Sequence, residues 1–229
     1  MTAGPTCRVV VVGGHTRSIG KTQLVCDVIS AFPEANWIAG KITQFGHGVC
    51  AQNGENCDCA PAEHSAAMDW EKHAGSGTDS ARFLAAGARR SLWLRTKQGF
   101  LAEGMPLLRA ALAEAAAGSG AGPLNVILES NSLLKLLKPS LYLVVLAPGK
   151  ADFKESARLV LDRADAVVLR DGPLPATGPA EGVNTPWNGA ALQLLKARPC
   201  FLQAEGQDLP AGVRDMVAEL LRAEGISRI

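Results

Sequence analysis

Short runs of apolar, mostly β-branched residues alternate with longer Ala- and Leu-rich amphipathic stretches along most of the chain. Such alternation is typical of βα units, whose helices cover both faces of a mostly parallel sheet. The runs Val9–Val12 and Tyr142–Leu146 are apolar at nearly every position, as strands buried on both faces are. The sequence therefore predicts an α/β fold, a three-layer sandwich around a mostly parallel sheet.

This pattern predicts the following elements. The expected strands are Arg8–Val12, Asn36–Ile42, Ser91–Leu94, Asn125–Glu129, Leu141–Ala147, Ala166–Leu169 and Pro199–Gln203. The expected helices are Lys21–Ala31, Asp79–Gly87, Leu101–Ala117, Phe153–Arg163, Gly189–Lys196 and Ala211–Glu224. The alternation resumes after each irregular stretch, so we expect one domain over residues 1–229, with an insertion at 43–78.

Composition and charge exclude several classes of protein. Lysine and arginine number 23 against 22 aspartates and glutamates, a net charge of +1, and there is no long basic run. This disfavours nucleic acid or a membrane surface as a partner. No apolar stretch approaches the ~18 residues of a membrane span, and the first residues do not resemble a signal peptide. We therefore expect a cytoplasmic protein in which the six cysteines are reduced.

A glycine-rich segment, GGHTRSIGKTQL, follows the first predicted strand and leads into a helix. Strand, glycine-rich turn, Gly-Lys-Thr and helix is the context of a phosphate-binding P-loop, although five residues separate Gly14 from Gly20 where four are usual. Lys21 would neutralise the β- and γ-phosphates and Thr22 would bind Mg²⁺. His15 and Arg17 either touch phosphate or are solvated. The residues predicted to bind the nucleotide are Gly13, Gly14, Ser18, Ile19, Gly20, Lys21, Thr22, Gln23 and Lys41.

An acid at the end of a neighbouring strand is the second requirement of a P-loop enzyme. Glu129 closes a predicted strand, and Asp79 begins the helix after the insertion, where it is either functional or a helix-capping residue. With Lys21, these two acids are the predicted catalytic residues. A guanine-specific Asn-Lys-x-Asp is absent, because Arg170-Asp171-Gly172 stands after the sixth strand and Gln203–Gly206 gives only a weak base signal. The nucleotide is thus ATP or GTP, bound with Mg²⁺.

The first 95 residues resemble the MobB family, molybdopterin-guanine dinucleotide biosynthesis protein B, in three motifs taken in order. These are the phosphate loop, Gly40–Thr43, and Gly77–Ser80 followed by Ala86-Gly87-Ala88. The resemblance implies a P-loop fold, nucleotide binding and an accessory role in metal-cofactor assembly. Lys41 matches the family's lysine and His47 approximately its histidine. The chain departs in its longer loop, its cysteine-bearing insertion, an extended C-terminal part, and Ser130 in place of a glycine.

Three cysteines and three histidines gather in the insertion. Cys50, Cys57 and Cys59, with His47 as fourth ligand, could complete a tetrahedral Zn²⁺ site, and the three thiolates could instead hold an iron–sulfur cluster. His64 and His73 are further imidazoles in this stretch. The alternative is a surface loop with reduced thiols, since the spacing is a signature of neither metal. Cys7, Cys26 and Cys200 are predicted to lie in the core.

Three functions follow from these patterns. The leading hypothesis is a P-loop NTPase that acts as an accessory protein in molybdenum-cofactor-like assembly, with a metal-binding loop and a cofactor-assembly enzyme or metalloenzyme client as partner. The second is a small-molecule kinase or ligase that uses ATP. The third is a non-catalytic, nucleotide-dependent binding module. A homodimer is compatible with each.

Overall fold

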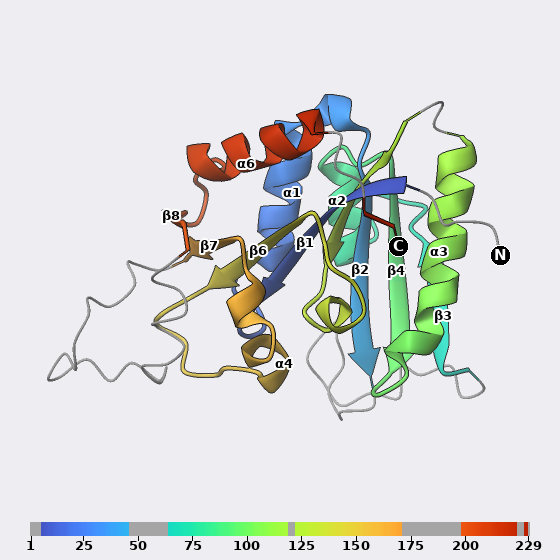
Figure 1. Cartoon of the computed structure of the whole chain (residues 1–229), viewed down its shortest axis with the longest axis horizontal. Coiled ribbons are helices and arrows are strands. Elements are labelled where there is room, and N and C mark those ends of the chain that lie inside the picture. The colour runs from blue at the N-terminus through green and yellow to red at the C-terminus, as the bar shows by residue number, and fades with distance from the viewer. Residues whose placement is uncertain (1–5, 46–63, 119–121, 171–197, 224–226, 229) are drawn as a thin grey trace, which may run out of the picture.

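The computed structural model describes residues 6–45, 64–118, 122–170, 198–223 and 227–228 of the chain (Figure 1). Its strands are β1 (Thr6–Gly14), β2 (Ile38–Phe45), β3 (Ala66–Trp70), β4 (Arg90–Lys97), β5 (Leu124–Glu129), β6 (Leu141–Leu146), β7 (Ala166–Leu169), β8 (Cys200–Leu202) and β9 (Ser227–Arg228). They form one sheet in the order β3-β4-β2-β5-β1-β6-β7-β8, and β9 pairs with the start of β1. Only β3 and β9 of these described strands run antiparallel to their neighbours.

Helices cover both faces of the sheet (Figure 1). The longer ones are α1 (Lys21–Ala31), α3 (Leu101–Ala117) and α6 (Ala211–Arg222), and the shorter ones are α2 (Asp79–Ala85) and α4 (Glu155–Arg158). The core divides into two apolar clusters, one with α1, α2 and α6 and the other with α3 and α4. Burial of apolar side chains on both faces stabilises each helix where it lies. The predicted three-layer α/β sandwich with a mostly parallel sheet is confirmed.

The register of the central strands determines which side chains meet at one edge of the sheet. β1 lies between β5 and β6: strands β2 to β5 lie on one side of it, and the chain then crosses over to place β6, β7 and β8 on the other. Glu129, the last residue of β5, pairs with Val12 on one side and with Lys41 of β2 on the other. In open α/β sheets, ligands collect at such a switch point, outside the carboxyl ends of the strands. The residues following β1, β2 and β5 are therefore brought to one place.

The structure differs from the sequence predictions at three points. The insertion contributes β3, an antiparallel edge strand whose side chains are mostly half-buried. The helix predicted over Phe153–Arg163 is only the short α4 and a separate 3₁₀ turn, Leu161–Arg163, because the backbone leaves helical geometry at Val160 (φ −130°). Cys200 is exposed on β8, so its assignment to the core was wrong.

The predictions for two of the cysteines and for two of the helices hold. Cys7 and Cys26 are buried, as expected. α1 and α3 have the predicted bounds. The helix predicted at Gly189–Lys196 lies outside the described residues. No helix in the described part of the chain has the length and apolar character needed to cross a membrane.

Candidate functional site

The loop between β1 and α1 has the backbone shape that its glycines allow. Ser18 (φ 49°) and Gly20 (φ 85°, ψ 18°) are left-handed, and Gly20 is the N-cap residue of α1. A side chain at Gly20 would be strained by this φ, and its Cβ would lie 3.0 Å from Nε of Arg170. Arg170 Nη2 also donates to the Gly20 carbonyl at 3.3 Å. Glycine is thus required here both by conformation and by the neighbouring guanidinium.

Two neighbouring segments fasten this loop in place. The amide of Asn131 bonds Gly14 twice: the Gly14 N–H donates to Asn131 Oδ1, and Asn131 Nδ2 donates to the Gly14 carbonyl, both at 2.8 Å. Lys150 Nζ donates to the Ser18 carbonyl at 2.7 Å, and the Thr16 hydroxyl donates to the Asp152 carboxylate. A loop held at both ends is preorganised for its ligand.

Sequence reasoning missed these anchors because their partners are more than 100 positions away in the chain. For Asn131 a weak signal existed, since it follows the strand that ends in Glu129.

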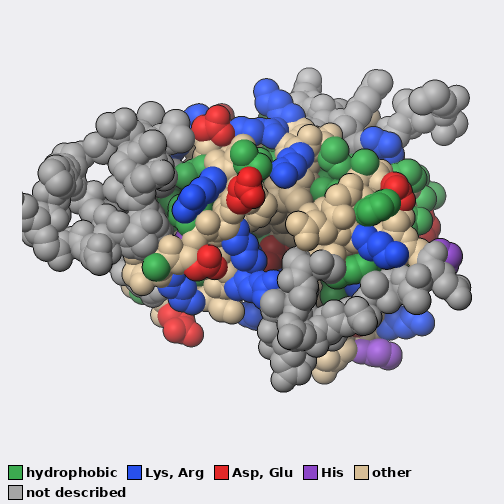
Figure 2. All heavy atoms as spheres, turned by 90° about the horizontal axis from the view of Figure 1, so that it is seen from below, with side chains coloured by type: hydrophobic (Ala, Val, Ile, Leu, Met, Phe, Trp, Pro, Cys, Tyr) green, Lys and Arg blue, Asp and Glu red, His purple; other side chains and the backbone are tan. Residues whose placement is uncertain are grey.

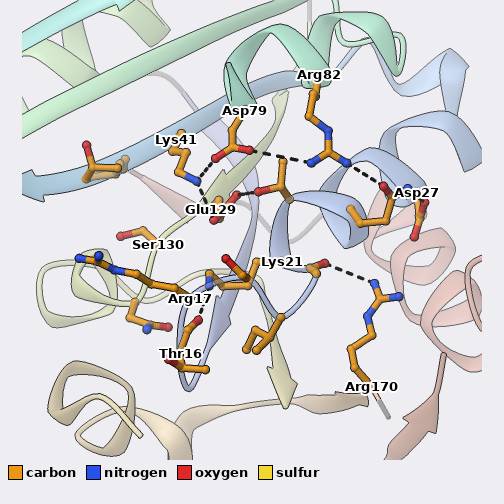
Figure 3. Close-up of a pocket in the computed structure, with 18 of the residues that line it drawn as sticks. Thr16, Arg17, Lys21, Asp27, Lys41, Asp79, Arg82, Glu129, Ser130 and Arg170 are labelled. Carbon is orange, nitrogen blue, oxygen red and sulfur yellow. Dashed lines mark hydrogen bonds and ion pairs between the residues drawn. The ribbon is translucent and has the colours of Figure 1, made fainter. Parts of the chain in front are cut away.

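Lys21, the first residue of α1, bends back over the loop. Its Nζ donates to the Thr16 carbonyl at 2.5 Å (Figure 3). Burial lowers the pKa of Lys21 to about 8, with the neighbouring charges of Glu129 and Lys41 acting in opposite directions. A bound anion would favour the charged form of this amine.

Two carboxylates, a hydroxyl and an ammonium meet beside Lys21 (Figure 3). The Thr22 hydroxyl donates to Glu129 Oε2 at 2.7 Å. Lys41 Nζ lies 3.1 Å from Glu129 Oε1 and also contacts the Asp79 carboxylate. Burial opposes the charged form of Lys41, but the charges of Glu129 and Asp79 outweigh it, so the pKa of Lys41 is raised. The predicted residues Lys21, Thr22, Lys41, Asp79 and Glu129 therefore lie together.

Asp79 is a first-turn residue of α2 and not its cap. Thr78 is the N-cap residue of α2, since its hydroxyl accepts from the Ala81 N–H, and Asp79 occupies the first turn. The Asp79 carboxylate nevertheless faces Lys41, with Arg82 Nη1 4.0 Å away. Its position at the helix start is thus what presents it to the site.

A cavity of about 1740 Å³ opens over the loop and collects these groups. Figure 2 shows it as a hollow bordered by lysine and arginine side chains. Besides Lys21 and Lys41, the cations lining it include Arg17, Lys154 and Arg170. This volume exceeds the roughly 300–1,000 Å³ typical of a small-molecule site, so the cavity has room for a nucleotide and further groups.

The other predicted loop residues have varied surroundings. Ile19 is buried in the core cluster with α1. Gln23 reaches across to Asp27 and Arg82, with contacts of 2.7 and 2.8 Å. His15 is buried against the Phe153 ring, and burial lowers its pKa. Arg17 is exposed and lines the cavity.

The segment Gln203–Gly206, which the sequence weakly predicts to contact the nucleotide base, lies at another part of this cavity. Glu205 and Gly206 line this part. Gln203 is buried, and its Nε2 donates to Asp27 Oδ2 at 2.8 Å and to the Gln207 carbonyl at 3.1 Å. Gln203 therefore holds the loop together, and only the residues after it face the cavity.

Lys41 and Asp79 also line a smaller cavity of about 280 Å³. Trp93 of β4 and the hydroxyls of Ser76, Thr78 and Ser80 complete its wall. The Trp93 indole N–H donates to the Thr43 hydroxyl at 2.9 Å. Lys41 and Asp79 are thus shared by two cavities, the larger lined by the phosphate loop and the smaller by the start of α2.

Glu71 organises that wall. It accepts from the hydroxyls of Thr78 and Ser80 at 2.7 and 2.9 Å, and from the backbone N–H groups of Lys72 and His73. Although burial acts to raise it, these hydrogen bonds lower the pKa of Glu71 to about 2. No motif in the sequence pointed to this carboxylate.

The predicted metal ligands Cys50, Cys57, Cys59 and His47 lie outside the described residues. His64 and His73 are described and exposed. No group of three or more His, Cys, Asp or Glu side chains that could hold a metal ion occurs in the described ranges.

Comparisons with known proteins were made against families, curated proteins and solved structures. No family model matches the chain, and no curated protein matches it. Among solved structures, the chain is similar to HypB from Helicobacter pylori, crystallised in complex with nickel. The TM-score is 0.46 at 14% identity, covering 94% of this chain and 87% of that one. A likeness this distant carries no functional argument, so the MobB resemblance stays a prediction and the site is interpreted from its own residues.

Proposed function

We propose that this protein binds a nucleoside triphosphate at the phosphate loop and hydrolyses it. The observation that carries the proposal is the meeting of Lys21 and Thr22, at the start of α1, with Glu129 and Asp79 in one cavity. Loop amides and the helix N-terminus favour phosphate oxygens, and Lys21 adds a positive charge for the β- and γ-phosphates. The chemistry is then mainly positioning and charge stabilisation.

Mg²⁺ is the metal that this fold implies, and the residues present fit it. Mg²⁺ prefers oxygen ligands, and Thr22, Glu129 and Asp79 offer one hydroxyl and two carboxylates. That the two carboxylates already share the Lys41 ammonium supports the fit, because it marks the spot as one where a cation is favourable. When bound with the nucleotide, Mg²⁺ would neutralise charge on the phosphate oxygens.

Lys41 would change partners when the nucleotide binds. Its ammonium lies between Glu129 and Asp79, where the metal ligands are needed. Since two cations cannot share these carboxylates at close range, we expect Lys41 to turn towards the anion in the cavity. Lys41 would thus compensate the two carboxylates before binding and contact phosphate afterwards.

Titration with ATP and with GTP, each with Mg²⁺, tests the binding site. We expect saturable binding of one of them by the wild type, and Lys21→Ala should lose most of it. Lys135→Ala, which removes an exposed lysine outside the cavity, is the matched control. Wild-type affinity in Lys21→Ala would exclude the proposed site, and binding without turnover would favour the non-catalytic module.

The finer proposal is an accessory role in metal-cofactor assembly, with nucleotide state coupled to a metal-binding loop. It rests on the MobB resemblance of the first 95 residues and on the cluster of Cys50, Cys57, Cys59 and His47. Three thiolates with one imidazole suit Zn²⁺, and the same thiolates suit an iron–sulfur cluster. The coupling proposed is the ordering of a segment by the terminal phosphate.

Anaerobic purification, metal analysis and a visible spectrum test this role. We expect bound zinc or the absorption of an iron–sulfur cluster, lost when all three cysteines of the cluster are changed to serine. Cys200→Ser is the control, because it removes one exposed thiol elsewhere. A colourless wild-type protein without metal would contradict the metal loop and leave the nucleotide site untouched.

A small-molecule kinase or ligase is the second candidate, and the smaller cavity favours it. This cavity shares Lys41 and Asp79 with the larger one, so an acceptor bound there would lie beside the terminal phosphate. Transfer of radiolabelled phosphate from nucleotide to a small hydroxyl-bearing or anionic compound, faster than hydrolysis, would establish it. Hydrolysis alone across such compounds would favour the leading proposal.

A further inference from the structure

Two cations in the larger cavity have no role in the site described so far. Arg17 projects from the phosphate loop towards Ser130, away from Lys21 (Figure 3). Lys154 lies in the segment between β6 and α4 and is half-buried. Both side chains line the cavity, together with Ser130 and Ser156.

The backbone brings the two cations together. The Lys154 N–H donates to the His15 carbonyl at 2.8 Å, two residues before Arg17. The Thr16 hydroxyl donates to the Asp152 carboxylate, two residues before Lys154. Segments 15–17 and 152–154 are thus bonded side by side, so their cations are presented by a fixed frame.

Neither cation has a direct polar partner in the described part of the protein, and the opposing charge that acts on Lys154 is the Asp152 carboxylate, which already accepts from the Thr16 hydroxyl. Across the described ranges, no hydrogen bond or ion pair reaches the side chain of Arg17 or Lys154, whereas Lys41 has two carboxylates. Burial lowers the pKa of Lys154, the nearby positive charge of Arg17 lowers it further, and the Asp152 carboxylate acts in the opposite direction. Holding the half-buried Lys154 ammonium near the exposed Arg17 guanidinium is unfavourable, and an anion bound between them would relieve it.

We infer that Arg17 and Lys154 form a second oxyanion subsite in this cavity, separate from the contacts that Lys21 makes. The inference rests on the proposed function, since it places this subsite beyond the phosphates of a bound nucleotide. Its ligand is a phosphate-like oxyanion, because a guanidinium presents a fork of donors and an ammonium a point charge, and both suit anionic oxygens. The oxyanion has two sources, the terminal phosphate of the triphosphate or a separate anionic substrate.

Inorganic phosphate is the probe for the subsite. It would be titrated calorimetrically into the protein saturated with nucleoside diphosphate and Mg²⁺, for the wild type and for the double variant Arg17→Gln/Lys154→Gln. We expect the double variant to bind phosphate at least about tenfold more weakly, a change of about 1.4 kcal/mol, since both charged donors to the anion are lost. Affinity for the diphosphate should change by less than about twofold, because Lys21 and the loop amides remain.

Competition with a non-hydrolysable triphosphate analogue distinguishes the two sources. If phosphate is displaced by the analogue, and the double variant binds the analogue about tenfold more weakly, the subsite receives the terminal phosphate. If phosphate binds alongside the analogue, it receives a separate substrate. Equal phosphate and analogue affinities in wild type and double variant would overturn the inference.

Controls keep this test apart from the test of the proposed function. Lys135→Gln/Lys138→Gln removes two exposed charges outside the cavity and should bind phosphate like the wild type. Arg17→Lys/Lys154→Arg keeps both charges and should retain most of the binding, which a merely structural role of the native side chains would not predict. A wild type that binds no nucleotide contradicts the proposed function, and phosphate titrated without nucleotide then tests the subsite alone.

Discussion

Lys41 and Lys154 line the same cavity but differ in how the protein treats their charge. Lys41 lies against Glu129 and Asp79, which raise its pKa although burial opposes this. Lys154 has no carboxylate partner among the described residues, and burial lowers its pKa. The protein has thus already oriented one lysine and left the other for an anion. A charge that the protein compensates, such as that of Lys41, stabilises the folded site, whereas a charge without a direct partner, such as that of Lys154, is available to an anionic ligand.

Removing the charge of Glu129, one of the two carboxylate partners of Lys41, should have the largest effect on activity. Glu129→Gln keeps the shape of the side chain but loses the charge that would bind Mg²⁺ and hold Lys41. We expect nucleotide hydrolysis to fall by at least about 100-fold, measured as phosphate release. Glu219→Gln, an exposed substitution on α6, is the control. Hydrolysis within a few-fold of wild type would remove Glu129 from the reaction.

Lys41→Met tests whether the contacts of Lys41 with its two carboxylates stabilise the folded protein. It leaves Asp79 and Glu129 near each other without their shared cation. We expect the free energy of unfolding to fall by about 2–3 kcal/mol at pH 7 in a denaturant titration. Lys135→Met, exposed and outside the cavity, should be close to wild type. A stable Lys41→Met protein would mean that the pair contributes little, as exposed pairs do.

Lys21 offers a test by pH. Its pKa is about 8, below the ordinary 10.5, because burial disfavours the charged form. A bound triphosphate favours that form, so binding at pH 8.5 should take up protons, and affinity should fall as pH rises through about 8 and above. Calorimetry in two buffers of different ionisation enthalpy measures the uptake. Repeating it with Lys154→Gln separates the contribution of Lys154, and binding enthalpies that are equal in both buffers would contradict the prediction.

The smallest effect, on the free energy of unfolding, is expected for a change at Lys154. Lys154→Gln removes a half-buried charge that has no carboxylate to leave behind in the described structure. The free energy of unfolding should therefore stay within about 0.5 kcal/mol of wild type. Denaturant titration beside Lys41→Met gives the contrast directly. A loss as large as that of Lys41→Met would show that Lys154 is a structural residue and end the comparison.

Much of the fold could be predicted because it depends on local patterns. Val9–Val12 is apolar throughout, and its burial in the centre of the sheet confirms the reading. β3 escaped prediction because Ala66–Trp70 lies at the sheet edge, half-buried, where neither alternation nor a continuous apolar run is required. The helix predicted over Phe153–Arg163 is shorter than expected because the Lys154 N–H bonds the His15 carbonyl at its start and the backbone leaves helical geometry at Val160.

The site was predictable to the same extent. Gly20-Lys21-Thr22 and Glu129 could be predicted because they lie at a helix start and a strand end, and local sequence patterns indicate both. Asn131, Asp152 and Lys154 were missed because what they do depends on residues that only the folded sheet brings near. The register that sets Lys41 opposite Glu129 is likewise a property of three strands together.

The double hydrogen bond between Asn131 and Gly14 also limits which residues can replace Asn131. The bond needs one acceptor and one donor on a single side chain, at a distance set by β1 and β5. Aspartate lacks the donor, leucine lacks both, and glutamine is one methylene longer than the gap allows. Position 131 should therefore be as invariant among descendants of this chain as the lysine of the loop, because its amide is fully used in holding the backbone of Gly14.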